Sequence, residues 1–203
     1  MDKNEFQTIM CNVLSAESAA IESLIHNIDW LQAKACIDLL LNCTGKVILS
    51  GCGTSGEAAK KIAHTLSCVE IPAFFLSPSD ALHGGLGVVE KHDIIILISK
   101  GGKTSELDIM MDRLIMMNAQ TIVVSEDPRT FLAGKATQFM QIRTEKEPDP
   151  FHMLATASTL SVIAFFDALT IVLQQETGFT KEKFLTIHPG GEVGYQLKSE
   201  IEK

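Results

Sequence analysis

The sequence has no excess of basic residues and no Cys-x-x-Cys pair, and we expect no leader segment. Its 17 Lys and Arg are outnumbered by 25 Asp and Glu, for a formal net charge of −8. Proteins that bind nucleic acid present basic surfaces, so we expect no nucleic-acid partner. The five cysteines form no Cys-x-x-Cys pair, and the start Met1-Asp2-Lys3-Asn4-Glu5 is polar. We therefore expect reduced thiols and a cytoplasmic location. No His-x-x-x-His spacing occurs either, so we expect no metal.

One apolar run is long enough to cross a bilayer. Residues 154–173 carry a single charge, at Asp167. The run begins with hydroxyl-bearing residues at 155–159 and stands alone among short alternating elements. We therefore expect a helix that is buried in the core or at a subunit interface, with no membrane partner.

Apolar runs alternate with helical patterns along most of the chain. Expected strands are residues 47–50, 73–76, 94–98, 121–124 and 139–142, and expected helices between them are 57–68, 105–117 and 130–134. The run Ile94-Ile-Ile-Leu-Ile98 is apolar without alternation, as in parallel strands covered on both faces. We predict an α/β three-layer sandwich, with a five-stranded parallel sheet flanked by helices. No repeat or linker interrupts it, so residues 1–203 form one domain, including a helical N-terminal segment of about 1–44.

Two glycine-rich turns each follow an expected strand and precede an expected helix. The first is Gly51-Cys52-Gly53-Thr54-Ser55-Gly56, and the second is Ser99-Lys100-Gly101-Gly102-Lys103-Thr104-Ser105-Glu106. Backbone N–H groups and hydroxyls at a helix N-terminus bind anions, above all phosphate. Both turns would meet at the carboxyl edge of the sheet, so we predict one crevice for a phosphorylated small molecule.

The first turn also matches the Gly-x-Gly-x-x-Gly pattern of dinucleotide-binding proteins. That fingerprint needs an acidic residue at the end of the next strand, where this chain has Leu76-Ser77-Pro78. A nucleotide-binding protein is therefore a weaker alternative.

Other polar side chains are candidates for the same crevice. Thr156, Ser158 and Thr159 form a hydroxyl cluster at the start of the long apolar helix, and three hydroxyls are more than capping requires. His83 and His188 each lie beside glycines in expected loops, where histidines are often functional. Glu106, in the first turn of its helix, is a candidate general base.

These motifs together resemble the sugar isomerase (SIS) domain, and more narrowly the D-arabinose 5-phosphate isomerases. The motifs that carry the resemblance are residues 51–56, Pro72-Ala-Phe-Phe75, Ala81-Leu-His-Gly84, Leu86-Gly87, residues 93–106 and 156–159, Asp167-Ala168-Leu169, and His188-Pro-Gly-Gly-x-x-Gly194. The resemblance implies a five-stranded parallel sheet in homotetramers with shared active sites. It implies interconversion of D-ribulose 5-phosphate and D-arabinose 5-phosphate through a cis-enediol, without a cofactor, in the biosynthesis of 3-deoxy-D-manno-octulosonate (Kdo) for lipopolysaccharide or capsule.

The resemblance also assigns residues. Glu106, Glu147, His188 and His83 fall on catalytic or active-site positions, and the sequence does not decide which glutamate moves the proton. The expected substrate-binding residues, from the two turns and the hydroxyl cluster, are Gly53, Thr54, Ser55, Ser99, Lys100, Gly101, Gly102, Lys103, Thr104, Thr156, Ser158 and Thr159.

The chain departs from the family pattern at three places. Thr54 stands where the family has lysine, and Gly85 stands where aspartate is common. The family motif Ser-Asn-Ser-Gly-Glu is here Ser99-Lys100-Gly101-Gly102-Lys103, which loses one phosphate-binding serine. These departures favour two alternatives: a non-catalytic sugar-phosphate-binding regulator, or an isomerase of another phosphosugar. Longer members continue into CBS modules, whereas this sequence ends soon after Gly194. We therefore expect an end product such as nucleotide-activated Kdo to act in the same crevice.

Overall fold

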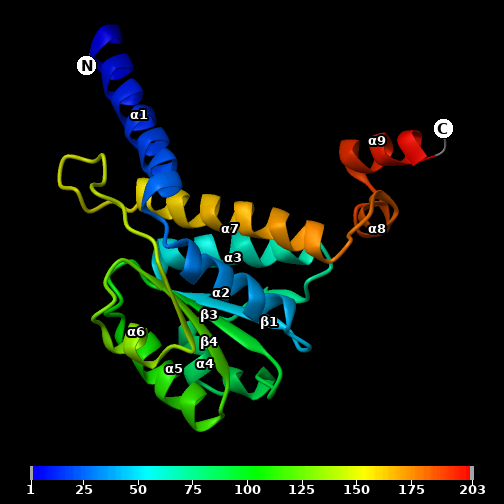
Figure 1. The fold of residues 1–203 in the computed structure, drawn as a ribbon. Helices are drawn as coiled ribbons and strands as arrows, with labels where there is room; N and C mark the ends of the chain where they lie inside the picture. Colours follow the sequence, from blue (N-terminus) through cyan, green and yellow to red (C-terminus); the bar gives the residue numbers. More distant parts are fainter. Residues whose placement is uncertain (1, 202–203) are drawn as a thin grey trace.

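The computed structural model describes residues 2–201, which form a parallel β-sheet between two layers of helices (Figure 1). The strands lie in the order β2-β1-β3-β4-β5, and every neighbouring pair is parallel. Their bounds are β1 (Val47–Gly51), β2 (Ala73–Phe75), β3 (Ile94–Ile98), β4 (Gln120–Ser125) and β5 (Gln138–Gln141). The predicted fold class is confirmed, and the strand bounds differ from the prediction by at most one residue.

Helices cover both faces of this sheet. One face carries the end of α1 (Lys3–Asn27), α2 (Trp30–Leu41), α3 (Gly53–Ser67) and α7 (Ala157–Glu176), and the other carries α4 (Pro78–Leu82), α5 (Ser105–Met116) and α6 (Phe131–Lys135). Each face has its own hydrophobic core: the first lies under α2, α3 and α7, and the second under α4, α5 and α6. Successive strand residues point to opposite faces, so Ile96 belongs to the first core and Leu97 to the second. Because both faces are covered, the strands need no polar side.

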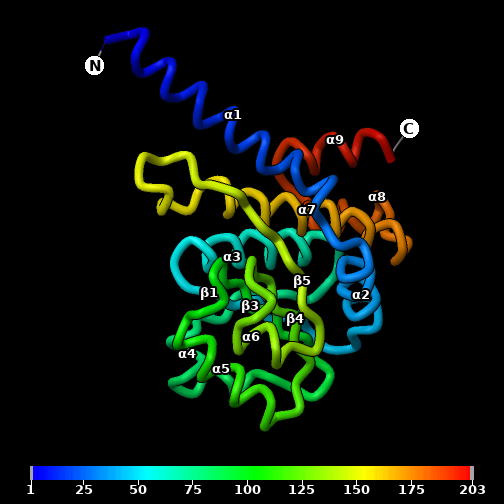
Figure 2. The backbone as a smooth tube through the Cα atoms, turned by 60° about the vertical axis from the view of Figure 1, so that its left-hand side comes forward, coloured from blue at the N-terminus to red at the C-terminus, as the bar shows by residue number. Residues whose placement is uncertain are grey.

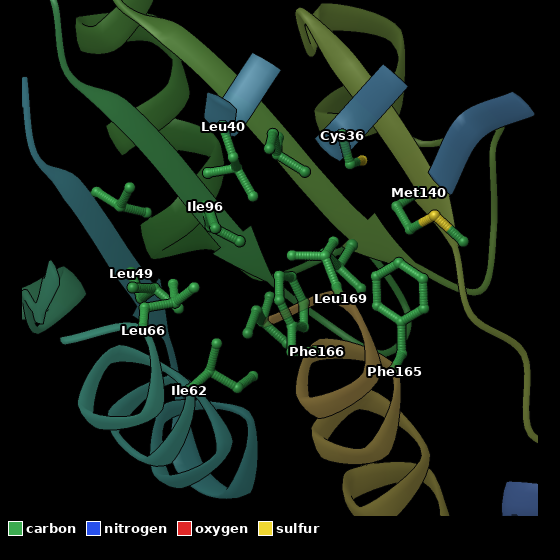
Figure 3. Packing of buried hydrophobic residues seen from close by; sticks show 14 of the residues in the cluster. Cys36, Leu40, Leu49, Ile62, Leu66, Ile96, Met140, Phe165, Phe166 and Leu169 are labelled. Atoms are coloured by element: carbon green, nitrogen blue, oxygen red, sulfur yellow. The ribbon is translucent and has the colours of Figure 1, made fainter. Parts of the chain in front are cut away.

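The first core aligns the helices that shape the carboxyl edge of the sheet. Figure 3 shows Ile62 and Leu66 of α3 and Phe166 of α7 packed over Leu49 and Ile96 of the strands. α3 directly follows β1, so its first turn lies at the carboxyl end of that strand. The first turns of α3 and α7 line one cavity, so both helix N-termini meet at this edge.

The two ends of the described chain extend from this body (Figures 1 and 2). Asp2 caps α1 by accepting hydrogen bonds from the backbone N–H groups of Asn4 and Glu5. The apolar side chains of Phe6, Met10 and Leu14 are 44%, 57% and 60% exposed. The predicted N-terminal helix therefore carries an apolar stripe, formed by Phe6, Met10 and Leu14, that this chain does not bury.

The other end contains two short helices after α7. These are α8 (Lys181–Ile187), which the Thr180 side chain caps, and α9 (Gly191–Ile201). The predicted loop His188-Pro-Gly-Gly is correct only as far as Gly190, because α9 begins at Gly191. Within the described residues, α7 is the one helix long and apolar enough to cross a membrane, and eight of its 20 residues are buried.

Candidate active site

A small cavity lies where the segments after β1, β3 and β4 meet the start of α7. Its volume is about 60 Å³, and apolar side chains such as Ile98 and Val124 form its floor. Its polar wall consists of Thr54, Ser55, Lys100, Ser125, Glu126, Ser158 and Thr159. Five of these seven residues, Thr54, Ser55, Lys100, Ser158 and Thr159, are among the substrate-binding residues predicted from the sequence. The other predicted site residues do not line this cavity.

The first glycine turn brings a helix end close to the strand. A Cβ at Gly56 would lie 2.7 Å from the carbonyl oxygen of Gly51, so only glycine permits this approach. Gly53 has a φ of 56°, in the left-handed region that favours glycine. Cys52 precedes the helix without a side-chain cap. The backbone N–H groups of the first turn of α3 therefore remain available to an anion.

The second glycine turn is held against β4. Gly102 has a φ of 64°, and a Cβ there would lie 2.7 Å from Thr130 Oγ1. Ser99 and Thr104 share a hydrogen bond of 2.9 Å between their hydroxyls, so Thr104 does not cap α5. In the first turn of α5, the Glu106 N–H binds that residue's own carboxylate and the Leu107 N–H donates to the Thr104 carbonyl. The Lys103 side chain is exposed.

Glu106 lies in the first turn of α5 and is exposed. Its own backbone N–H and the Ser105 hydroxyl, which donates to Oε2 over 2.9 Å, hold its pKa below the usual range. Burial and the charge of Glu106 both raise the pKa of the Cys52 thiol. Because β1 and β3 pair with Gly51 opposite Ile98, the two turns follow neighbouring strand ends.

Glu147 is buried behind the cavity wall, where four donors bind its carboxylate. Lys100 Nζ lies 2.7 Å from Oε1, and the Ser158 hydroxyl also donates to Oε1. The backbone N–H groups of Thr156 and Ser158 donate to Oε2 over 3.0 and 3.4 Å. Burial raises the pKa of Glu147, but the bonds from Lys100, Ser158 and Thr156 outweigh it and hold the pKa below its ordinary value.

This arrangement makes Glu147 the cap of α7. Thr156 is the N-cap residue by position, yet its own side chain makes no capping hydrogen bond, and its hydroxyl oxygen is buried without a partner among the described residues. The Thr159 hydroxyl donates to the Ala155 carbonyl. Lys100, expected as a free phosphate ligand, is instead paired with Glu147.

Glu126 is a cavity residue that the sequence analysis missed. It follows β4 directly, and its Oε1 accepts the backbone N–H of Thr144 over 3.1 Å. The signal was its position at the carboxyl end of a predicted strand, beside the turn Asp127-Pro128. Burial raises its pKa, although the Thr144 N–H bond and the nearby Lys100 act in the opposite direction.

The two histidines lie apart from the cavity. His83 ends α4 and is exposed. The His188 ring packs against Phe184, with centroids 4.5 Å apart, and its Nε2 lies 3.6 Å from the Cys68 sulfur, at the far end of α3. Thirteen residues of helix separate Ser55 from Cys68, or about 20 Å at ~1.5 Å per residue. Within one chain, His188 therefore does not reach the cavity that it was predicted to share.

No group of three His, Cys, Asp or Glu side chains within residues 2–201 is placed to hold a metal ion. Polar groups that could hold a sugar phosphate are the hydroxyls of the cavity wall, the free N–H groups at the start of α3, and the exposed Lys103 of the second turn.

Known proteins are similar to this chain in sequence and in fold. Residues 40–172 match the SIS domain family. The Salmonella typhi arabinose 5-phosphate isomerase GutQ is 37% identical over 164 residues, covering 81% of this chain and 51% of GutQ. The chain thus spans about half the length of that relative.

Two solved structures resemble it closely. A Listeria monocytogenes protein is 45% identical with a TM-score of 0.92, covering 94% of this chain and 100% of that one. A protein of Escherichia coli CFT073, solved in complex with arabinose 5-phosphate, is 29% identical with a TM-score of 0.90, covering 93% and 100%. By this match over most of its length, the chain belongs to the SIS domain family.

Proposed function

We propose that this chain is a phosphosugar isomerase that interconverts D-ribulose 5-phosphate and D-arabinose 5-phosphate through a cis-enediol. The observation that carries the proposal is that hydroxyls from the first turns of α3 and α7 line one cavity together with Lys100 and Glu126, at the carboxyl edge of the sheet. The identity to GutQ and the likeness to a structure that contains arabinose 5-phosphate support it. The reaction needs proton transfer by side chains and no metal or redox cofactor.

The substrate phosphate would bind where α3 begins. The free N–H groups and dipole of α3 favour an anion, and Thr54 and Ser55 add hydroxyl donors. Lys103 is exposed and adds positive charge from the second turn. Lys100 would reach the phosphate only by leaving Glu147, so in its present position it neutralises that carboxylate instead.

The site is proposed to be shared between subunits of a homotetramer. A cavity of about 60 Å³ is far smaller than the ~300–1,000 Å³ of ordinary ligand pockets. His188 is too distant to act in the cavity of its own chain, and its Nδ1 is buried without a partner among the described residues. The exposed apolar stripe of α1 provides a surface for association. A neighbouring subunit would then complete the pocket with its own His188.

A second candidate is an isomerase of another phosphosugar. Thr54 stands in the wall of the cavity where the family pattern has lysine, so the contacts to the sugar differ. The arabinose 5-phosphate proposal includes three further points. These are a role in Kdo biosynthesis, a cytoplasmic location, and binding of a nucleotide-activated sugar in the same crevice.

Two measurements test the proposal. Purified protein is incubated with pentose, hexose and heptulose phosphates, and formation of the isomeric sugar is followed without added metal. Exchange of the substrate's carbon-bound hydrogen in D₂O then separates an enzyme from a binder. Conversion of ribulose 5-phosphate supports the proposal, conversion of a different sugar supports the second candidate, and binding without exchange contradicts both.

A further inference from the structure

Glu126 lies in the wall of the cavity, where hydrogen bonds to segments on either side of β4 hold it. Its backbone N–H donates to the Lys100 carbonyl over 2.9 Å, and its own carbonyl accepts from the Gln141 side chain over 2.8 Å. Its Oε1 accepts the Thr144 N–H from the segment after β5. The segments after β3, β4 and β5 thus fix the carboxyl group at the cavity. Glu147, in contrast, is not part of the cavity surface in this chain.

The surroundings of the glutamates at this site push their pKa values apart. Burial raises the pKa of Glu126, and the negative charge of Glu147 adds to it. The Thr144 N–H bond, Lys100 and Arg143 lower it, but they do not offset the burial. The pKa values of Glu147 and Glu106 both lie below their ordinary range. Carboxyl groups separated in this way can act as acid and base within one site.

We infer that Glu126 is a catalytic acid–base residue of this chain, which exchanges a proton with the oxygen atoms at C1 and C2 of the phosphosugar. The inference rests on the proposed isomerase function and adds to it a residue that the family resemblance does not assign.

The proton transfers balance with one further carboxylate, Glu147 or Glu106. That carboxylate takes a proton from C1 of the ketose, the C1–C2 double bond forms, and Glu126 gives its proton to the carbonyl oxygen at C2. The product is the cis-enediol. Glu126 then takes the proton from the oxygen at C1, while the first carboxyl group returns its proton to C2. The aldose leaves, and both carboxyl groups regain their starting states.

The test compares wild type with Glu126→Gln, which keeps an oxygen acceptor for the Thr144 N–H and removes only the transferable proton. Loss of a general acid–base group costs ~10²–10⁴-fold in rate, so we expect kcat to fall at least about 100-fold with KM within about threefold. Because the acid must be protonated, wild-type kcat should fall as pH rises through the pKa of Glu126. The Glu126→Gln profile should lack that fall.

Two further variants serve as controls. Glu145→Gln removes an exposed carboxylate from the nearby segment and should behave as wild type. Glu126→Asp restores a carboxyl group and should recover part of kcat. Wild-type turnover with an unchanged kcat in Glu126→Gln, or a low kcat with the alkaline fall retained, overturns the role of Glu126 alone. Absence of turnover in wild type overturns the proposed function, and the role of Glu126 with it.

Discussion

Replacing Glu147 by alanine should destabilise the protein by about 2–4 kcal/mol. The change leaves the Thr156 and Ser158 N–H groups without their acceptor, and each such group, when buried, costs about 1–3 kcal/mol. Thr156 is half-buried, so water recovers part of its share. Lys100 also loses its partner, but its side chain is 37% exposed. Water therefore solvates the freed ammonium group, and the loss of this ion pair contributes nothing to the expected destabilisation.

Glu147→Gln separates charge from hydrogen bonding. The amide oxygen still accepts backbone N–H groups, so this variant should lose less than Glu147→Ala at pH 7. Burial raises the pKa of Glu147, but its donors hold the folded-state pKa below the value of about 4.3 expected in the unfolded chain. The stabilisation is therefore complete above that pH and is lost as pH falls through the folded-state pKa. The gap between wild type and Glu147→Gln should shrink on acidification.

Urea unfolding at pH 7 and at several acidic values measures both effects. Protein concentration is kept constant, because subunit association contributes to apparent stability. If Glu147→Ala unfolds within about 0.5 kcal/mol of wild type, as substitutions away from such features do, Glu147 does not cap α7. A gap between wild type and Glu147→Gln that is independent of pH would show that its charge contributes nothing.

Three other outcomes are expected. The Lys100→Ala, Lys103→Ala double variant should bind sugar phosphate at least several-fold more weakly by calorimetry, because a charge-assisted contact contributes about 1.5–3 kcal/mol. Equal affinity would show that neither lysine contacts the phosphate. The His188→Ala and Glu126→Gln variants should each have low activity alone and should recover part of the wild-type activity when they are refolded together. The reason is that a mixed tetramer contains some sites with an intact His188 from one subunit and an intact Glu126 from the other. If no activity is recovered, the site is not shared between subunits. Nucleotide-activated Kdo should raise the apparent KM for the sugar phosphate without changing kcat. Purely noncompetitive inhibition would exclude the crevice as its binding site.

The sequence by itself determined the sheet and the position of the crevice. The short apolar run Ile94-Ile-Ile-Leu-Ile98, without alternation, is typical of a parallel strand covered on both faces. Glycines directly after β1 and β3 predicted turns into helices at one edge of that sheet. Because strand direction and helix position follow from local pattern, Ser55 and Lys100 were correctly expected to lie at the same cavity.

Only the tertiary structure decided what the charged groups do there. Glu126 borders the cavity, Glu147 is covered by Lys100 and the start of α7, and His188 lies at the far end of α3. The exposure of the apolar stripe on α1 likewise depends on what packs against it. Sequence patterns report which side of one element is apolar. The direction of a side chain and its partners depend on contacts between segments distant along the chain, and those contacts set both burial and pKa.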